Sequence, residues 1–175
     1  KTPGLTTLLE EVGPADHYLF VLLDGLGLNQ LEFYPQNGFF RTNYARELRA
    51  IFPSTTSTVL TSLVTLAWPA EHGVPGWWTY FPDLQRSISI LKSEERESGH
   101  SLKKFKIHLA SLFPVTSLLP AFFRQCHSFL PRYMRKSEFV KWSLGRTPVS
   151  GYKDLDHARK LITRYYRKLT GPSFS

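Results

Sequence analysis

An apolar run that ends in an acidic residue and two glycines constrains the fold of this chain most. Residues 18–23 are apolar throughout, and Asp24-Gly25-Leu26-Gly27 follows at once. A continuous apolar run bounded by turn residues is typical of a strand buried on both faces, as in the parallel sheet of an α/β protein. Ligands collect at the carboxyl ends of such strands. We therefore expect residues 17–24 to form a strand that brings Asp24 to a ligand-binding edge.

A hydroxyl-rich loop is the second informative segment. Pro53-Ser54-Thr55-Thr56-Ser57-Thr58 leads into a short apolar stretch, and serine and threonine are favoured where helices begin. We expect a short helix with Thr56 in its first turn. Taken alone, a threonine here is more often a helix cap than a nucleophile, and Asp24 is more often a turn residue than a metal ligand.

The rest of the chain alternates between strand and helix patterns. Residues 77–81 and 127–130 read as short strands, the first continuing the same sheet, and residues 93–104 read as a polar surface loop. Apolar residues at helical spacing predict a helix over residues 154–169 with Asp154 as its cap, stopped by Gly171-Pro172 before a new strand. This order predicts an α/β sheet covered by helices on both faces.

Length and cysteine content set wider limits. A chain of 175 residues is long enough for one domain with a sizeable core. A single cysteine, Cys126, cannot form an internal disulfide or a thiolate metal site, which fits a reducing cytoplasm. The longest apolar run is far too short to span a bilayer. We expect a cytoplasmic protein with no membrane segment.

Charge points to the class of partner. The chain has 22 Lys and Arg against 14 Asp and Glu, a formal charge of +8, and residues 92–106 and 124–141 are much richer in basic side chains than the first 40 residues. Such a charge attracts phosphate-bearing partners over long range, although a run of charge is more often a solvated face.

Three motifs resemble, in the same order, the first sequence motifs of a known enzyme family. Val21-Leu-Leu-Asp-Gly-Leu-Gly27, Phe52-Pro-Ser-Thr-Thr-Ser-Thr58 and Glu71-His-Gly73 are similar to the first motifs of nucleotide pyrophosphatase/phosphodiesterase-type enzymes of the alkaline-phosphatase superfamily. The resemblance is good over residues 20–78, returns weakly over residues 151–174, and is poor over the basic middle region, residues 92–150.

The resemblance implies a fold and its extent. It implies an α/β three-layer sandwich with a mostly parallel sheet, of which residues 1–175 would be a single α/β domain forming the N-terminal half of a larger catalytic domain, so the chain looks truncated. The sequence also departs from the family at Thr65-Leu66, where Thr-Gly is usual after the nucleophile helix.

The resemblance also implies a site and an activity. Thr56 would be the nucleophile and a metal ligand, and Asp24 a ligand of a divalent metal, with two zinc ions expected and the second site incomplete. A hydroxyl needs such a metal or a base to become a nucleophile. The implied function is metal-dependent hydrolysis of small phosphodiester or nucleotide pyrophosphate substrates through a phosphothreonine, with this chain alone inactive. His72 is interpreted as a turn residue outside the site.

A second hypothesis for the function remains as an alternative to the hydrolase. The chain could be a non-catalytic fragment or pseudoenzyme whose basic middle region, with Tyr133, Phe139 and Trp142 interleaved, binds nucleic acid or an acidic partner. Hydrolytic activity and the salt dependence of any nucleic-acid binding distinguish the two.

Overall fold

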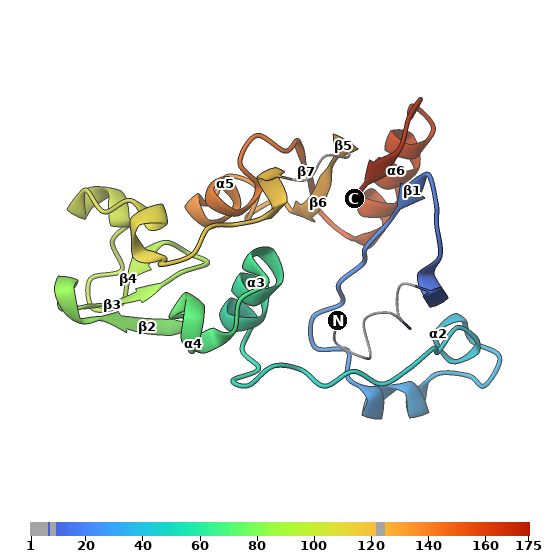
Figure 1. Ribbon diagram of the computed structural model, residues 1–175, viewed down its shortest axis with the longest axis horizontal. Coiled ribbons are helices and arrows are strands. Elements are labelled where there is room, and N and C mark those ends of the chain that lie inside the picture. Colours follow the sequence, from blue (N-terminus) through green and yellow to red (C-terminus); the bar gives the residue numbers. More distant parts are fainter. Residues whose placement is uncertain (1–6, 8–9, 122–124) are drawn as a thin grey trace.

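The fold is mixed α/β, with parallel strands at one end of the molecule and an antiparallel sheet at the other (Figure 1). The structure is a computed structural model that describes residue 7, residues 10–121 and residues 125–175. At the parallel end, β8 pairs with one strand on each side, and the three are β1 (His17–Tyr18), β8 (Ser173–Phe174) and β5 (Gln125–Cys126). The expected parallel sheet is therefore present, built from short strands.

A second parallel pair continues from the first. The pair consists of β6 (Ser128–Pro131) and β7 (Val149–Tyr152), with helix α5 (Glu138–Leu144) between them in the chain. His127 links β5 to β6: its N–H donates to the Phe174 carbonyl at 3.0 Å, and the Ser128 N–H donates to the Pro148 carbonyl at 3.0 Å. The strands β1, β8, β5, β6 and β7 consequently run in the same direction.

The sheet at the other end is antiparallel, so the prediction that residues 77–81 continue the parallel sheet is wrong. Its three strands are β2 (Trp78–Phe81), β3 (Arg86–Ser89) and β4 (Glu94–Glu95). The 3-10 turn η2 (Pro82–Leu84), followed by Gln85 at φ 50°, reverses the chain directly after β2. A connection this short can join only antiparallel neighbours.

The core lies between helix α3 (Thr56–Thr65), the antiparallel sheet and α5. Its buried apolar side chains are Val64, Val74, Ile88, Ile90, Leu91, Leu102, Leu109 and Phe139. Leu102, in η3 (Leu102–Phe105), is 1% exposed, and its N–H donates to the Ser93 carbonyl at 2.9 Å. The expected surface loop over residues 93–104 is thus partly core, because Leu102 anchors it there.

The helices include the one that the sequence predicts best. Helix α6 (Leu155–Tyr166) begins behind Asp154, whose carboxylate accepts the His157 N–H at 2.8 Å, and β8 follows it as expected. The remaining short helices are η1 (Leu28–Phe33), α2 (Phe39–Thr42), α4 (Pro69–His72), η4 (Leu109–Leu112) and η5 (Leu119–Ala121). No helix among the described residues combines the length and the apolar character that crossing a membrane requires.

The first strand is shorter and more exposed than predicted. β1 has two residues, and the apolar side chains of Leu19 to Leu23 are 43–60% exposed. The parallel pairing extends past β1 only as far as Phe20, whose N–H donates to the Ser175 carbonyl at 2.6 Å. The expectation of a strand buried on both faces up to Asp24 therefore fails, because β8 pairs with only its first residues.

Candidate active site

Asp24 and Thr56 lie side by side in the structure. The Thr56 hydroxyl donates a hydrogen bond to Asp24 Oδ2 at 3.1 Å, although the two residues are 32 positions apart in the sequence. Asp24 is exposed and Thr56 is partly exposed, so solvent and small ligands reach both oxygens. A carboxylate and a hydroxyl thus share one open position on the surface.

Helix α3 presents Thr56 at its N-terminus. Thr56 is the first residue of the helix, and Thr55 is its N-cap. The Thr55 side chain makes no capping bond to the first amides and is hydrogen-bonded instead to the Thr58 hydroxyl at 2.9 Å. The amides of a first helical turn have no partner within the helix and carry its partial positive charge. They are therefore suited to an anionic group bound beside Thr56.

Buried hydroxyl side chains fix the rest of α3 in place. Ser57, Thr58 and Thr61 have no exposed surface. The Thr61 hydroxyl donates to the Ser57 carbonyl at 2.7 Å, and the Thr65 hydroxyl donates to the Thr61 carbonyl at 2.7 Å. These bonds satisfy the buried hydroxyls of two threonines within the helix, so one face of α3 can pack inward while its first residue stays accessible.

His72 is a buried structural residue at the end of α4, and its interpretation as a simple turn residue is wrong. Its side chain is 1% exposed. Nδ1 accepts the Val74 N–H at 3.1 Å, which leaves the proton on Nε2 to donate to the Ser62 hydroxyl at 2.8 Å. Burial lowers the pKa of His72 and favours this neutral form. The residue thereby connects α4 to α3.

The donor set for a metal is incomplete in the part of the chain that the structure describes. There, no three His, Cys, Asp or Glu side chains are close enough to hold one ion. His17 is hydrogen-bonded to Ser173 and His127 to Ser150. A catalytic zinc normally has three protein ligands. Asp24 and Thr56 offer two oxygens, which is fewer than a zinc site requires.

Sequence reasoning found the pair Asp24–Thr56 but missed the contact between Ser62 and His72. The ten-residue spacing of that contact has no local signal, because it depends on how α4 folds back on α3.

Comparison with known proteins gives a family. The family model for type I phosphodiesterase / nucleotide pyrophosphatase matches residues 18–110, which include Asp24, Thr56 and the whole of α3. No curated protein and no solved structure matches the chain. Because the match spans more than half of the chain, this protein belongs to the type I phosphodiesterase / nucleotide pyrophosphatase family.

Proposed function

We propose that this protein hydrolyses phosphodiester or nucleotide pyrophosphate bonds in a metal-dependent reaction that passes through a covalent phosphothreonine at Thr56. The observation that carries the proposal is the 3.1 Å contact between the Thr56 hydroxyl and Asp24 at the N-terminus of α3. Membership of the family supports the reaction class.

Thr56 is the nucleophile in this proposal. Its hydroxyl releases its proton to solvent and its oxygen forms a bond to phosphorus while the bond from phosphorus to the leaving oxygen breaks. The leaving oxygen takes up a proton from solvent where it departs as an alcohol or a phenol, or departs as a phosphate. Water then cleaves the phosphothreonine and restores the hydroxyl. The uncapped amides of the first turn of α3 stabilise the phosphoryl oxygens, on which negative charge develops in the transition state.

Asp24 and Thr56 are the proposed first ligands of a divalent metal, of which zinc is the expected example. A bound divalent ion would supply positive charge that lowers the pKa of the Thr56 hydroxyl. The Asp24 carboxylate would then bind the ion instead of accepting the hydroxyl proton. Because two oxygens make a weak zinc site, we expect little or no turnover by residues 1–175 alone.

The proposal includes the wider architecture of the family. The parallel direction of β1, β8, β5, β6 and β7 is compatible with a three-layer α/β sandwich of the alkaline-phosphatase type. The substrate would be a small phosphodiester or a nucleotide.

Metal binding by Asp24 is the first test. We expect Asp24→Asn to weaken Mn²⁺ or Zn²⁺ binding at least about tenfold in calorimetry, because a neutral amide replaces a charged ligand. Glu47→Gln is the matched control, since it also removes one exposed carboxylate. Equal affinity of the Asp24 variant and the wild type would refute the metal role.

Turnover of an aryl phosphodiester is the second test. It is measured with added Zn²⁺ or Mn²⁺ in this chain and in the longest product of its coding sequence. Thr56→Ala should abolish release of the phenol, and Thr56→Ser should retain part of it, because only serine keeps a hydroxyl. Wild-type rates in the alanine variant, or no turnover in any form, would refute the proposal.

A further inference from the structure

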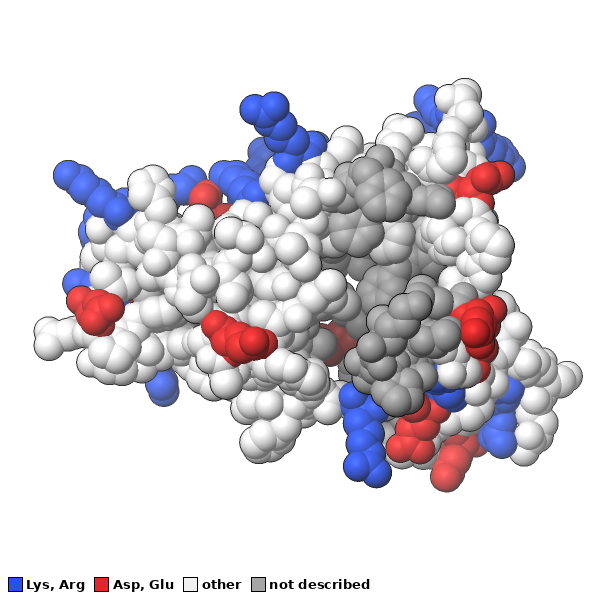
Figure 2. Space-filling model, in the orientation of Figure 1, with Lys and Arg blue, Asp and Glu red and all other residues white. Residues whose placement is uncertain are grey.

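The charge of the protein is concentrated in one part of the chain. Residues 132–168 contain eleven of the 22 Lys and Arg but only three of the 14 acidic residues, so this stretch accounts for the whole formal charge of +8. Figure 2 shows Lys and Arg side chains projecting from the side of the molecule where α5 and α6 lie, whereas most acidic side chains in this view lie elsewhere. An anionic partner would therefore approach this side first.

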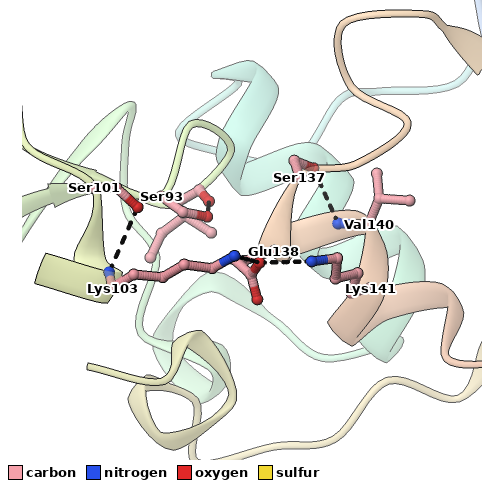
Figure 3. A network of polar contacts seen from close by, with 8 residues as sticks. Ser93, Ser101, Lys103, Ser137, Glu138, Val140 and Lys141 are labelled. Carbon is pink, nitrogen blue, oxygen red and sulfur yellow. Dashed lines mark hydrogen bonds and ion pairs between the residues drawn. The ribbon is translucent and has the colours of Figure 1, made fainter. Parts of the chain in front are cut away.

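Some of these cations are already neutralised. Glu138 lies between two lysines, 2.8 Å from Lys141 Nζ and 3.1 Å from Lys103 Nζ (Figure 3). Hydrogen bonds from Lys141 and Lys103 hold the pKa of Glu138 below its usual value, so the carboxylate stays charged. On α6, Asp156 pairs with Arg159 at 2.8 Å and with Lys160 at 2.7 Å. Three cations of this stretch, Lys141, Arg159 and Lys160, are therefore less available to a partner, as is Lys103 outside it.

The aromatic residues of the basic region also differ in how far they are available to a partner. Phe139 is 3% exposed and belongs to the core, and Trp142 stacks on Phe113 at 3.9 Å between ring centroids. Tyr133 is 84% exposed. Of the three aromatic residues that the sequence suggested for nucleic-acid binding, Phe139 is buried, Trp142 is partly buried and only Tyr133 is exposed.

Four cations lie at the carboxyl ends of β6 and β7, three of them within three residues of Tyr133 in the chain. Pro131 is in register with Tyr152, so Arg132 and Lys153 are the next residues of two adjacent parallel strands. The Arg132 N–H donates to the Tyr152 carbonyl at 2.8 Å. Arg135 and Lys136 follow in the same turn, and among the described residues none of the four cations forms an ion pair.

Gly151 allows the two arginines to gather there. A Cβ atom at Gly151 would lie 3.2 Å from Arg132 Cα and 3.2 Å from Arg135 Cδ. The bare backbone of β7 thus lets the turn, with its arginines, pack against the strand end. The neighbouring Asp154 carboxylate accepts the His157 N–H, and among the described residues it forms no ion pair with any of the four cations.

We propose that Arg132, Tyr133, Arg135, Lys136 and Lys153 form a binding surface for the phosphodiester backbone of single-stranded nucleic acid. Unpaired cations bind backbone phosphates, and an exposed aromatic ring stacks on a base only where the base is unpaired. The surface lies at the carboxyl ends of strands that run parallel to β1, whose carboxyl end leads towards Asp24. The inference goes beyond the proposed hydrolase, because it adds a binding surface for an anionic polymer outside the residues of the candidate active site.

Fluorescence anisotropy of the full chain with a labelled single-stranded oligonucleotide tests the surface. Arg135→Gln/Lys136→Gln should weaken binding about tenfold near 0.15 M salt and lower the slope of log affinity against log salt by about 1.4, which is the loss of two phosphate contacts. Tyr133→Ala should weaken binding at least about fivefold, whereas Tyr133→Phe keeps the stacking ring and should bind like wild type. Melting curves check that each variant is folded.

The matched control removes the same charge from the same stretch. Arg159→Gln/Lys160→Gln replaces two exposed cations that are already paired with Asp156, and it should change affinity less than about threefold. Equal losses in the two double variants would mean that only net charge attracts the oligonucleotide, and the proposed surface would be wrong. Equal binding of duplex DNA, or displacement by polyglutamate at the same charge concentration, would also overturn it, the latter in favour of an acidic protein.

The result does not depend on catalysis. Thr56→Ala should bind the oligonucleotide as wild type does, because Thr56 lies outside the surface. Loss of hydrolysis with intact binding would leave the surface standing, whereas turnover without binding would refute the surface alone.

Discussion

Leu66 ends α3 in a conformation that leucine rarely adopts. We therefore expect glycine to be more stabilising than alanine at this helix position, the reverse of the usual order. The residue has φ 53° and ψ 25°, the left-handed region, and its N–H donates to the Ser62 carbonyl at 2.8 Å. Its side chain is 75% exposed. Glycine is the usual residue at such a helix end, because it has no Cβ to clash in the left-handed conformation.

The expected size follows from two opposing terms. A residue with a Cβ pays roughly 1–2 kcal/mol for the left-handed conformation. Glycine avoids that cost but loses roughly 0.5–1 kcal/mol more backbone entropy on folding than alanine does. Since Leu66→Gly and Leu66→Ala both remove the same exposed side chain, we expect the glycine variant to be the more stable of the two by about 0.5–1 kcal/mol.

Urea unfolding of the two variants measures this difference. Leu63, in the same helix and 40% exposed, is the matched control. There the order should reverse, with Leu63→Gly less stable than Leu63→Ala by about 1 kcal/mol, as in any helix interior. If alanine were also the better residue at position 66, Leu66 would not be left-handed, and the described end of α3 would be wrong.

Three further predictions concern other parts of the structure. Burial lowers the pKa of His72, so its ring should titrate below pH 6.5 in NMR, and titration above 6.5 would contradict this. As the pH decreases through 6.5, the unfolded chain binds the His72 proton before the folded chain does, so the free energy of unfolding should fall. Asp154→Ala should destabilise the protein by about 1 kcal/mol in urea unfolding, because it removes the cap of α6, and an unchanged midpoint would rule out the cap. Gly151→Ala should cost at least about 1 kcal/mol, since the new methyl group would crowd Arg132, whereas Gly171→Ala, with open space around it, should not; equal effects would argue against the close approach.

Local patterns predicted the elements whose causes are local. Helix α6 follows from the periodicity of residues 154–169 and from Asp154, and α3 follows from the hydroxyl-rich residues that begin it. The proximity of Asp24 and Thr56 was available only through the order of the family motifs, because nothing in either segment alone specifies the 3.1 Å contact.

The sequence did not predict features that depend on pairing between strands distant in the chain. The apolar run after β1 was expected to be buried, but an apolar pattern cannot tell how far a neighbouring strand extends. The direction of β2 depended on the tight turn at Gln85. The basic cluster was placed within residues 92–150, whereas Lys153 joins Arg132 only through the register of β6 and β7.

The identity of the nucleophile is the central claim, and trapping the covalent intermediate tests it most directly. The longest product of the coding sequence, the form in which turnover is expected, is mixed with an aryl phosphodiester and Zn²⁺, quenched in acid within one turnover, digested and analysed by mass spectrometry. We predict an adduct in which Thr56 oxygen carries the substrate's phosphoryl group after one phenol has left, with no adduct in Thr56→Ala. Turnover without an adduct, or an adduct on another residue that persists in Thr56→Ala, would contradict the account.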